Sequence, residues 1–96
     1  MPLDYNNAKI YKIVNDIDDE IYIGSTCQRL SMRMVGHRVQ ANKQYKIKLY
    51  EHMNELGIDH FKIVLIKAYK CENIEQLQKK EEFYKRRLKP SLNDKI

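Results

Sequence analysis

Apolar residues recur along the chain with two different periods, and these periods predict its secondary structure. β-Branched and aromatic runs over 10–14, 21–23 and 61–66 predict three strands. Apolar residues spaced three or four positions apart predict helices over 30–41, 47–56 and 74–88. The polar segment NDIDDE between the first two runs favours a tight turn, so these two strands should form a β-hairpin. The fold class is therefore mixed α/β (α+β).

The third run, over 61–66, is apolar on both faces toward its end. This pattern is typical of a strand in the middle of a sheet or of one covered by helices. Its neighbours must be the two hairpin strands, because the sequence offers no other strand. Residues 1–8 are polar and fit a frayed end or a lead-in strand.

One tyrosine lies in each hairpin strand. Tyr11 shares a face of its strand with Ile13, and Tyr22 points away from both of its isoleucine neighbours. The two phenols can converge on one face if the strand register allows it. Tyrosine is also common in sheets for packing reasons alone, so a purely structural role stays open.

The second strand is expected to end at Gly24, which Ser25 and Thr26 follow. A glycine at this point allows a tight turn or the close approach of a ligand. Small hydroxyl residues before a helix suit helix caps or phosphate contacts. Taken alone, the Gly-Ser-Thr segment is also consistent with an ordinary turn.

Two charged residues lie on apolar helix stripes. Arg33 and His37 share the inward stripe of the first helix with Met34. Glu81 falls on the stripe of the last helix, whereas Glu82 lies about 100° further round and should face solvent. A buried arginine needs a carboxylate or a phosphate, and a buried carboxylate needs a partner or a metal ion. A structural salt bridge between Arg33 and Glu81 is therefore one open alternative.

Composition and charge narrow the class of protein. The 96 residues suffice for one domain, and the net charge is +5. The charge is uneven, since residues 29–96 hold sixteen basic and eight acidic residues, and residues 29–48 hold six basic residues and no acid. Such a surface suits a polyanion such as a nucleic acid. Charge alone leaves a merely solvated basic surface equally open.

Other features argue against a membrane-spanning protein, a secreted protein and a zinc-binding protein. No apolar run approaches the roughly 20 residues that a membrane span requires, and the N-terminus lacks the apolar stretch of a signal peptide, so we expect a soluble, intracellular protein. Cys27 and Cys71 lack a zinc-site spacing, and we expect free thiols, with a disulfide left open. His52 should pack or hydrogen-bond at the surface of the second helix.

Taken in order, these fragments resemble the GIY-YIG nuclease domain over nearly the full chain. The matching fragments are KIY at 9–11, YIGST at 22–26, Arg33 with His37, a glutamate on a late helix at Glu81, and PxxN from Pro90 to Asn93. The resemblance implies one domain over 1–96 with a three-stranded antiparallel sheet flanked by helices. It also implies an endonuclease that uses Mg²⁺ or Mn²⁺ to hydrolyse DNA phosphodiester bonds.

The resemblance implies roles for individual residues. Glu81 would hold the metal ion, Tyr11 would lie near the attacking water, and Asn93 would support the site. Tyr22 and Arg33 would line the phosphate, and His37 would act as an auxiliary acid, base or phosphate contact. The further candidates for substrate contact are Gly24, Ser25, Arg29 and Arg38. Because a tyrosine is a poor base at neutral pH, Tyr11 would need neighbouring cations or a metal-bound water to lower its pKa, and Lys12 or His37 could supply part of this effect.

The sequence departs from the family pattern at two places. Lys9 stands where the family's first glycine usually does, which should alter the start of the strand rather than abolish activity. Residues 27–29 lengthen the path from Tyr22 to Arg33 by about one residue, so Arg29 competes for the arginine role, although no histidine follows it four positions on. Two alternatives remain open: a non-catalytic nucleic-acid-binding module with the same fold, and a domain that acts as a homodimer or with a fused or bound partner.

Overall fold

The sheet is built around its first strand. The computed structural model describes residues 4–93, in which β1 (Lys9–Asn15) lies between β2 (Tyr22–Thr26) and β3 (Phe61–Ala68). Both pairings are antiparallel. The predicted three-stranded sheet is confirmed, but β1, not the last strand, is central. The apolar residues of β3 are explained by both faces of the sheet, since Phe61 and Ile63 pack on the face covered by the helix α1 (Leu30–Asn42) and Ile66 packs on the opposite face with Leu77.

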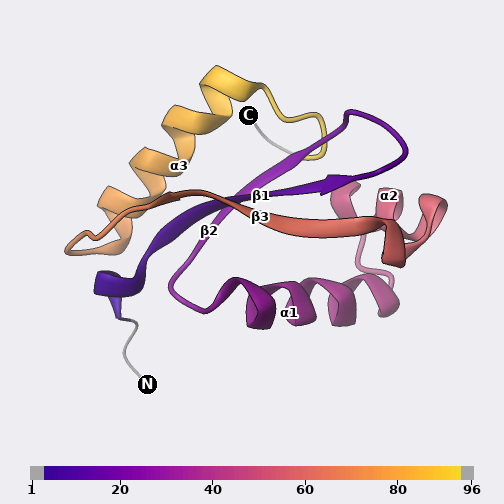
Figure 1. The fold of residues 1–96 in the computed structure, drawn as a ribbon, viewed down its shortest axis with the longest axis horizontal. Helices are drawn as coiled ribbons and strands as arrows, with labels where there is room; N and C mark the ends of the chain where they lie inside the picture. Colours follow the sequence, from indigo (N-terminus) through magenta and orange to yellow (C-terminus); the bar gives the residue numbers. More distant parts are fainter. Residues whose placement is uncertain (1–3, 94–96) are drawn as a thin grey trace.

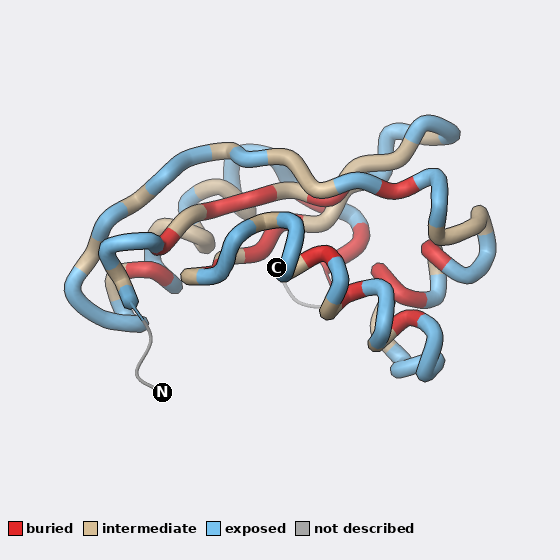
Figure 2. The backbone as a smooth tube through the Cα atoms, turned by 60° about the horizontal axis from the view of Figure 1, so that its bottom comes forward, coloured by how far each residue is buried: buried red, intermediate tan, exposed pale blue. Residues whose placement is uncertain are grey.

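Helices cover both faces of the sheet (Figure 1). α1 and α2 (Lys48–Leu56) lie on one face, and α3 (Ile74–Leu88) lies on the other. The side chains of β1 alternate accordingly, since Tyr11 and Ile13 pack with α1 and α2 whereas Ile10 packs with Leu77 of α3. Figure 2 shows buried residues both on the strands and on the helices that cover them. Because a shift of one residue would reverse this alternation, burial sets the register.

The ends of the elements follow local chemistry. Asn73 caps α3 by accepting a hydrogen bond from the backbone N–H of Gln76, and Lys89 ends this helix in the left-handed conformation before Pro90. Gly57, with φ of 106°, ends α2 as predicted. Short 3₁₀ turns occupy Tyr5–Asn7 and Ile58–His60. Of the two alternatives for residues 1–8, the lead-in strand is therefore wrong for residues 5–7, and residues 1–3 lie outside the described residues.

Two smaller expectations are also settled. β2 runs on to Thr26, so the prediction that this strand ends at Gly24 is wrong. Cys27 and Cys71 are both free thiols. Within residues 4–93, no helix is long and apolar enough to cross a membrane.

Candidate active site

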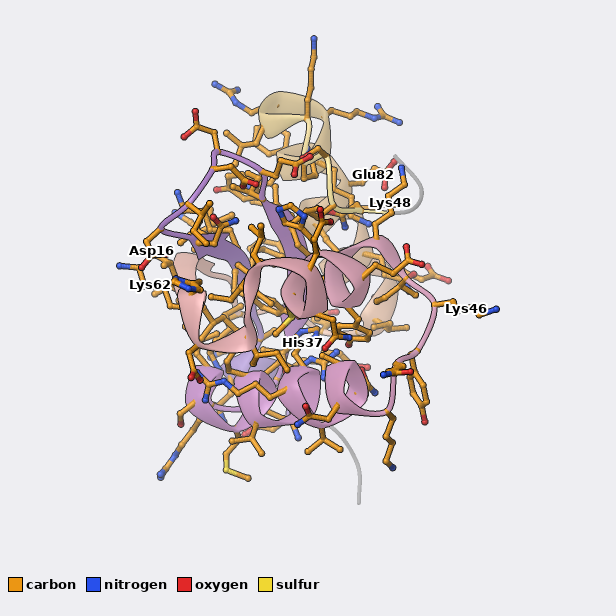
Figure 3. All side chains as sticks on the ribbon, turned by 90° about the vertical axis from the view of Figure 1, so that its right-hand side faces the viewer. Asp16, His37, Lys46, Lys48, Lys62 and Glu82 are labelled. Atoms are coloured by element: carbon orange, nitrogen blue, oxygen red, sulfur yellow. The ribbon has the colours of Figure 1, made fainter. Side chains whose placement is uncertain are left out.

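Two tyrosines and a histidine meet beneath the sheet. The ring centroids of Tyr11 and Tyr22 lie 6.4 Å apart, which confirms that the two phenols converge on one face. Both rings contact the imidazole of His37, with centroid distances of 5.9 and 5.6 Å. His37 is 0% exposed and lies in the interior between α1 and α2 (Figure 3). The hairpin and α1 therefore build one aromatic cluster.

Hydrogen bonds fix the tautomer of His37. Its Nε2 lies 2.8 Å from the Tyr11 hydroxyl, and its Nδ1 lies 2.8 Å from the Tyr50 hydroxyl. Tyr50 donates its single proton to the side-chain oxygen of Gln40, which can only accept. Tyr50 must then accept from a protonated Nδ1, because its own proton is already used. This leaves Nε2 of His37 unprotonated and able to accept the Tyr11 proton.

Burial keeps these groups neutral. It is the main cause that raises the pKa of Tyr11 far above its usual range, while the charge and hydrogen bonding of Arg33 oppose this rise. Burial, helped by the charge of Arg33, lowers the pKa of His37 to about 4. Burial also raises the pKa of Tyr50 to about 12. Arg33, rather than Lys12 or His37, is thus the group that favours ionised Tyr11, which corrects the expectation from the sequence.

Arg33 reaches this cluster without a carboxylate partner. It is partly buried on α1, and within residues 4–93 it forms no salt bridge. The alternative of an Arg33–Glu81 salt bridge is therefore wrong. Glu81 instead pairs with Lys85, one turn further along α3, at 2.8 Å. The positive charge of Arg33 remains available to an anion.

Glu81 is nevertheless tied to the same site. Its Oε1 accepts a 2.6 Å hydrogen bond from the Ser25 hydroxyl of β2. Burial comes first among the causes that raise the pKa of Tyr22, and the charge of Glu81 comes next. A hollow of about 260 Å³ opens here, lined by Ser25, Thr26, Cys27, Gln28, Arg33, Ile74 and Leu77. Arg33, which has no carboxylate partner, and Ser25, which is hydrogen-bonded to Glu81, thus line one recess.

Gly24 lies beneath Tyr11 instead of contacting solvent. The two residues are paired across the strands, and Gly24 is buried. A Cβ at position 24 would lie 2.5 Å from the Tyr11 hydroxyl oxygen and 2.6 Å from its Cζ. The glycine therefore makes room for the phenol, so the predicted substrate contact of Gly24 has no exposed surface to act through.

The other substrate-contact candidates divide into two groups. Ser25 lines the recess. Arg29, just before α1, and Arg38, on α1, are both exposed. In the described part of the chain, the side chains of these two arginines form no salt bridge. His37 cannot touch a phosphate in this conformation, because its ring is buried and both nitrogens are hydrogen-bonded.

Asn93 completes the outer edge of β2. Its side-chain amide accepts from the backbone N–H of Ile23 and donates to the carbonyl of Ile23, both at 2.8 Å. The adjacent Leu92 donates its backbone N–H to the carbonyl of Ile21 at 3.0 Å. These bonds satisfy backbone groups that the edge strand would otherwise leave unpaired. Asn93 therefore holds the strand that carries Tyr22 and Ser25.

Lys9, which stands where the family usually has a glycine, forms a hydrogen bond with the loop before α1. It is the first residue of β1, and its Nζ donates to the carbonyl of Gln28 at 2.8 Å. This bond ties the longer loop before α1 to the sheet. The departure from the family pattern and the extra loop length are thus structurally connected.

The donor set of the recess fits a hard divalent cation. Glu81 presents one carboxylate, and Mg²⁺ commonly takes only one or two protein carboxylates together with water and phosphate oxygens. The Oε2 of Glu81 already attracts a positive group, the Lys85 ammonium. Glu81 is therefore the residue of this site that could hold Mg²⁺ or Mn²⁺.

A second set of metal-type ligands lies elsewhere. One atom each of Asp18, Glu20 and His52 all lie within 4.8 Å of one another, at the β1–β2 turn and on α2. His52 pairs with Asp18 at 2.8 Å and with Glu20 at 3.0 Å, which agrees with the expected surface hydrogen bonding of this histidine. None of the predicted site residues belongs to this set.

Three residues of the site were not predicted from the sequence: Gln40, Tyr50 and Lys85. Gln40 follows His37 by three positions and Lys85 follows Glu81 by four, so both share a helix face with a predicted residue. These helical spacings are the signals from which Gln40 and Lys85 could have been predicted. Tyr50 reaches His37 from α2, and no sequence spacing links two separate helices.

Comparison with known proteins identifies the protein family to which this chain belongs. The GIY-YIG catalytic domain family matches residues 7–94. In the fold alone, the chain resembles the catalytic domain of homing endonuclease I-TevI, with a TM-score of 0.75, 22% identity, and coverage of 90% of this chain and 92% of that one. The chain belongs to the GIY-YIG family.

Two curated relatives come from Invertebrate iridescent virus 6. Uncharacterized protein 019R is 36% identical over 75 residues, which cover 78% of this chain and 27% of that protein. Putative MSV199 domain-containing protein 146R is 35% identical over 65 residues, which cover 68% and 26% respectively. The chain thus spans about a quarter of the length of these relatives.

Proposed function

We propose that this chain is an endonuclease that uses a divalent metal ion, Mg²⁺ or Mn²⁺, to hydrolyse phosphodiester bonds in DNA. The observation that carries the proposal is the recess where Arg33, which has no carboxylate partner, lies with Ser25, the hydrogen-bond partner of Glu81. A phosphate in this recess would meet the fixed cation of Arg33 and would lie near Ser25, which contacts the metal-holding carboxylate. Membership of the GIY-YIG family and the likeness to a homing endonuclease fold support the choice of DNA.

The hydrogen-bonded chain behind Tyr11 supplies a path for a proton. Tyr11 is itself buried, 1% exposed, so substrate binding would have to bring the attacking water to its hydroxyl. The phenol would then take a proton from that water as it passes its own proton to Nε2 of His37. The neutral imidazole becomes imidazolium and keeps its Nδ1 proton on the bond to Tyr50. Tyr11 is a phenol again at the end of the step, so its raised pKa is no obstacle.

Charge limits this relay to the substrate-bound enzyme. The pKa of His37 is about 4, mainly because of burial and in part because of the charge of Arg33. A bound phosphate would neutralise Arg33 and favour the imidazolium. Arg33 and the partly buried Tyr22 phenol would hold the phosphate in place, and a metal ion on Glu81 would stabilise the negative charge that develops on the phosphate oxygens.

A cleavage assay over several DNA forms tests the proposal. Supercoiled, linear, branched and single-stranded DNA would be incubated with the protein in Mg²⁺, in Mn²⁺ and in EDTA. We expect cutting of at least one form with either metal, none in EDTA, and a loss of at least about 100-fold in Arg33→Ala, since a fixed phosphate-binding cation contributes about 3 kcal/mol or more. Arg38→Ala, on the outer face of the same helix, is the matched control.

The same assay separates the enzyme from a binding module. DNA binding without cutting in any metal would overturn the proposal in favour of a non-catalytic nucleic-acid-binding domain. Equal losses in Arg33→Ala and Arg38→Ala would show that general basic charge, and not this recess, acts on DNA.

A further inference from the structure

The outer face of α3 carries an exposed aromatic ring between two hollows. Phe83 is 43% exposed and lines both of them. The first hollow, of about 400 Å³, is also lined by Tyr69, Gln76, Lys79 and Lys80. The second, of about 470 Å³, is also lined by Lys79, Glu82, Arg86 and Arg87. We call these residues together the Phe83 surface.

Four cations of the Phe83 surface have no acidic partner. Within residues 4–93, no salt bridge involves Lys79, Lys80, Arg86 or Arg87. One carboxylate, that of the half-buried Glu82, lines the second hollow. The surface is therefore positively charged and open to anions.

The cations are arranged around aromatic rings. Lys80 Nζ lies 4.9 Å from the centroid of Phe83, and Arg87 Cζ lies 5.3 Å from the same centroid. Lys80 also lies 5.4 Å from the Tyr69 ring centroid. Lys80 and Arg87 thus lie over the ring of Phe83, where a flat π-system could replace them while a phosphate drew the cations outward.

This surface is distinct from the candidate active site. Phe83 follows Glu81 by two residues, which places it about 200° further round the helix and about 10 Å away across its diameter. Glu81 faces β2, where it bonds Ser25, whereas Phe83 faces solvent. A strand leaving the recess could therefore reach the Phe83 surface by passing around α3.

We propose that the Phe83 surface binds unpaired nucleotides of a DNA strand, with bases stacked on Phe83 and phosphates held by the surrounding lysines and arginines. The inference rests on the proposed function for the identity of the polymer. Duplex DNA would use the cations alone, because the faces of its bases are already stacked within the helix. Single-stranded segments can use both the ring and the charges.

Binding without cleavage tests this proposal. The full chain would be titrated into a fluorescently labelled 12-nucleotide oligothymidylate and into a labelled duplex of equal length, in EDTA, with fluorescence anisotropy as the readout. Phe83→Ala is expected to weaken single-strand binding by about 5- to 100-fold, the value of one stacked base. Its duplex affinity should change by less than about twofold, because phosphate contacts dominate duplex binding.

Three further variants make the result specific. Phe83→Tyr keeps a ring and should retain single-strand affinity. The double variant Lys79→Ala/Arg86→Ala should reduce the slope of log K against log salt by about 1 to 1.5, as expected for two lost phosphate contacts on a single strand. Val39→Ala replaces an exposed apolar residue of α1, 45% exposed, and should leave both affinities unchanged.

Two results would overturn the proposal: unchanged single-strand affinity in Phe83→Ala, or an equal loss for both DNA forms. Circular dichroism would establish that the variants are folded. Because the titrations contain no metal ion and measure no cutting, they can succeed even if the protein proves not to be a nuclease. They can also fail while cleavage at the recess holds.

Discussion

The hydroxyl oxygen of Tyr11 lies where the side chain of residue 24 would begin. A Cβ built on Gly24 would be 2.5 Å from this oxygen. The two residues face each other in the β1–β2 register, so neither can shift without moving a strand. The hydrogen bond from Tyr11 to His37 therefore depends on the absence of a side chain at position 24.

Gly24→Ala should consequently damage activity more than stability. The added methyl must push the phenol away from His37 Nε2, from which it now lies 2.8 Å. We expect cleavage to fall by about 100-fold, the lower range for a misplaced acid–base group, and the free energy of unfolding to fall by about 1 to 3 kcal/mol through overpacking. Single-turnover cleavage and urea unfolding would measure the two effects. Val35→Ala on α1, a change at a residue that is 49% exposed and lies outside the site, is the control. Wild-type cleavage in Gly24→Ala would contradict the placement of Tyr11.

Tyr50→Phe should allow His37 to adopt either of its two neutral tautomers. Without the Tyr50 hydroxyl, the Nδ1 proton loses its acceptor, and either ring nitrogen can carry it. We expect cleavage to fall by about 10-fold, since only part of the imidazole then accepts the Tyr11 proton. ¹⁵N NMR would show an unprotonated Nε2 in the wild type and a mixture in the variant. The matched control is Tyr45→Phe, an exposed tyrosine with 49% exposure. A protonated Nε2 in the wild type would rule out the relay.

The buried His37 should make the fold sensitive to acid. Its pKa is lowered to about 4, below the value of about 6.5 in the unfolded chain. The unfolded state then binds a proton first, so the stabilisation is present above pH 6.5 and is lost as the pH falls toward 4. The loss approaches 3 kcal/mol, at about 1.4 kcal/mol per pH unit. Urea unfolding from pH 7 to pH 4 would measure it.

The acid effect has a direct control. His37→Gln should flatten this pH dependence, whereas His60→Gln, a change at an exposed histidine, should keep it. NMR titration of the His37 ring in the wild type gives an independent reading if His37→Gln does not fold. A His37 that titrates near pH 6.5 would contradict the burial argument.

Asn93→Ala should destabilise the edge of the sheet. The substitution removes both hydrogen bonds to Ile23 and leaves a buried N–H and a buried carbonyl without partners. We expect a loss of about 2 to 4 kcal/mol in the free energy of unfolding. Asn54→Ala removes one hydrogen bond, to the carbonyl of Ala41, at an exposed residue and should cost less than about 1 kcal/mol. Equal losses in the two variants would mean that Asn93 does not hold β2.

The elements could be predicted from the sequence because their apolar periods are strong. The predictions from the sequence failed where a particular side-chain contact, and not the apolar period, determined the structure. Gly24 resembles a strand terminator, yet the glycine is required by the ring of Tyr11 from the neighbouring strand. Arg33 and Glu81 resemble an ion pair by pattern, but Lys85 on the same helix reaches Glu81 first. Helical periodicity shows that a charge points inward without showing which group it meets.

The site was predicted less completely than the fold. Tyr11, Tyr22 and His37 came together as the strand and helix faces predicted. The functional roles assigned through the family resemblance stay predictions. The link from His37 to Tyr50 joins two helices whose relative placement no local pattern encodes.

The central claim is that the recess beside Glu81 cuts DNA, and one paired measurement tests it most directly. Single-turnover cleavage in Mg²⁺ would be compared for the wild type, Glu81→Gln and Glu82→Gln, which differ by one position on the same helix. The account predicts a fall of at least about 100-fold for Glu81→Gln and less than about twofold for Glu82→Gln, because it is the Glu81 carboxylate that is hydrogen-bonded to Ser25 of the recess. Wild-type cleavage by Glu81→Gln, or an equal loss in both variants, would contradict it.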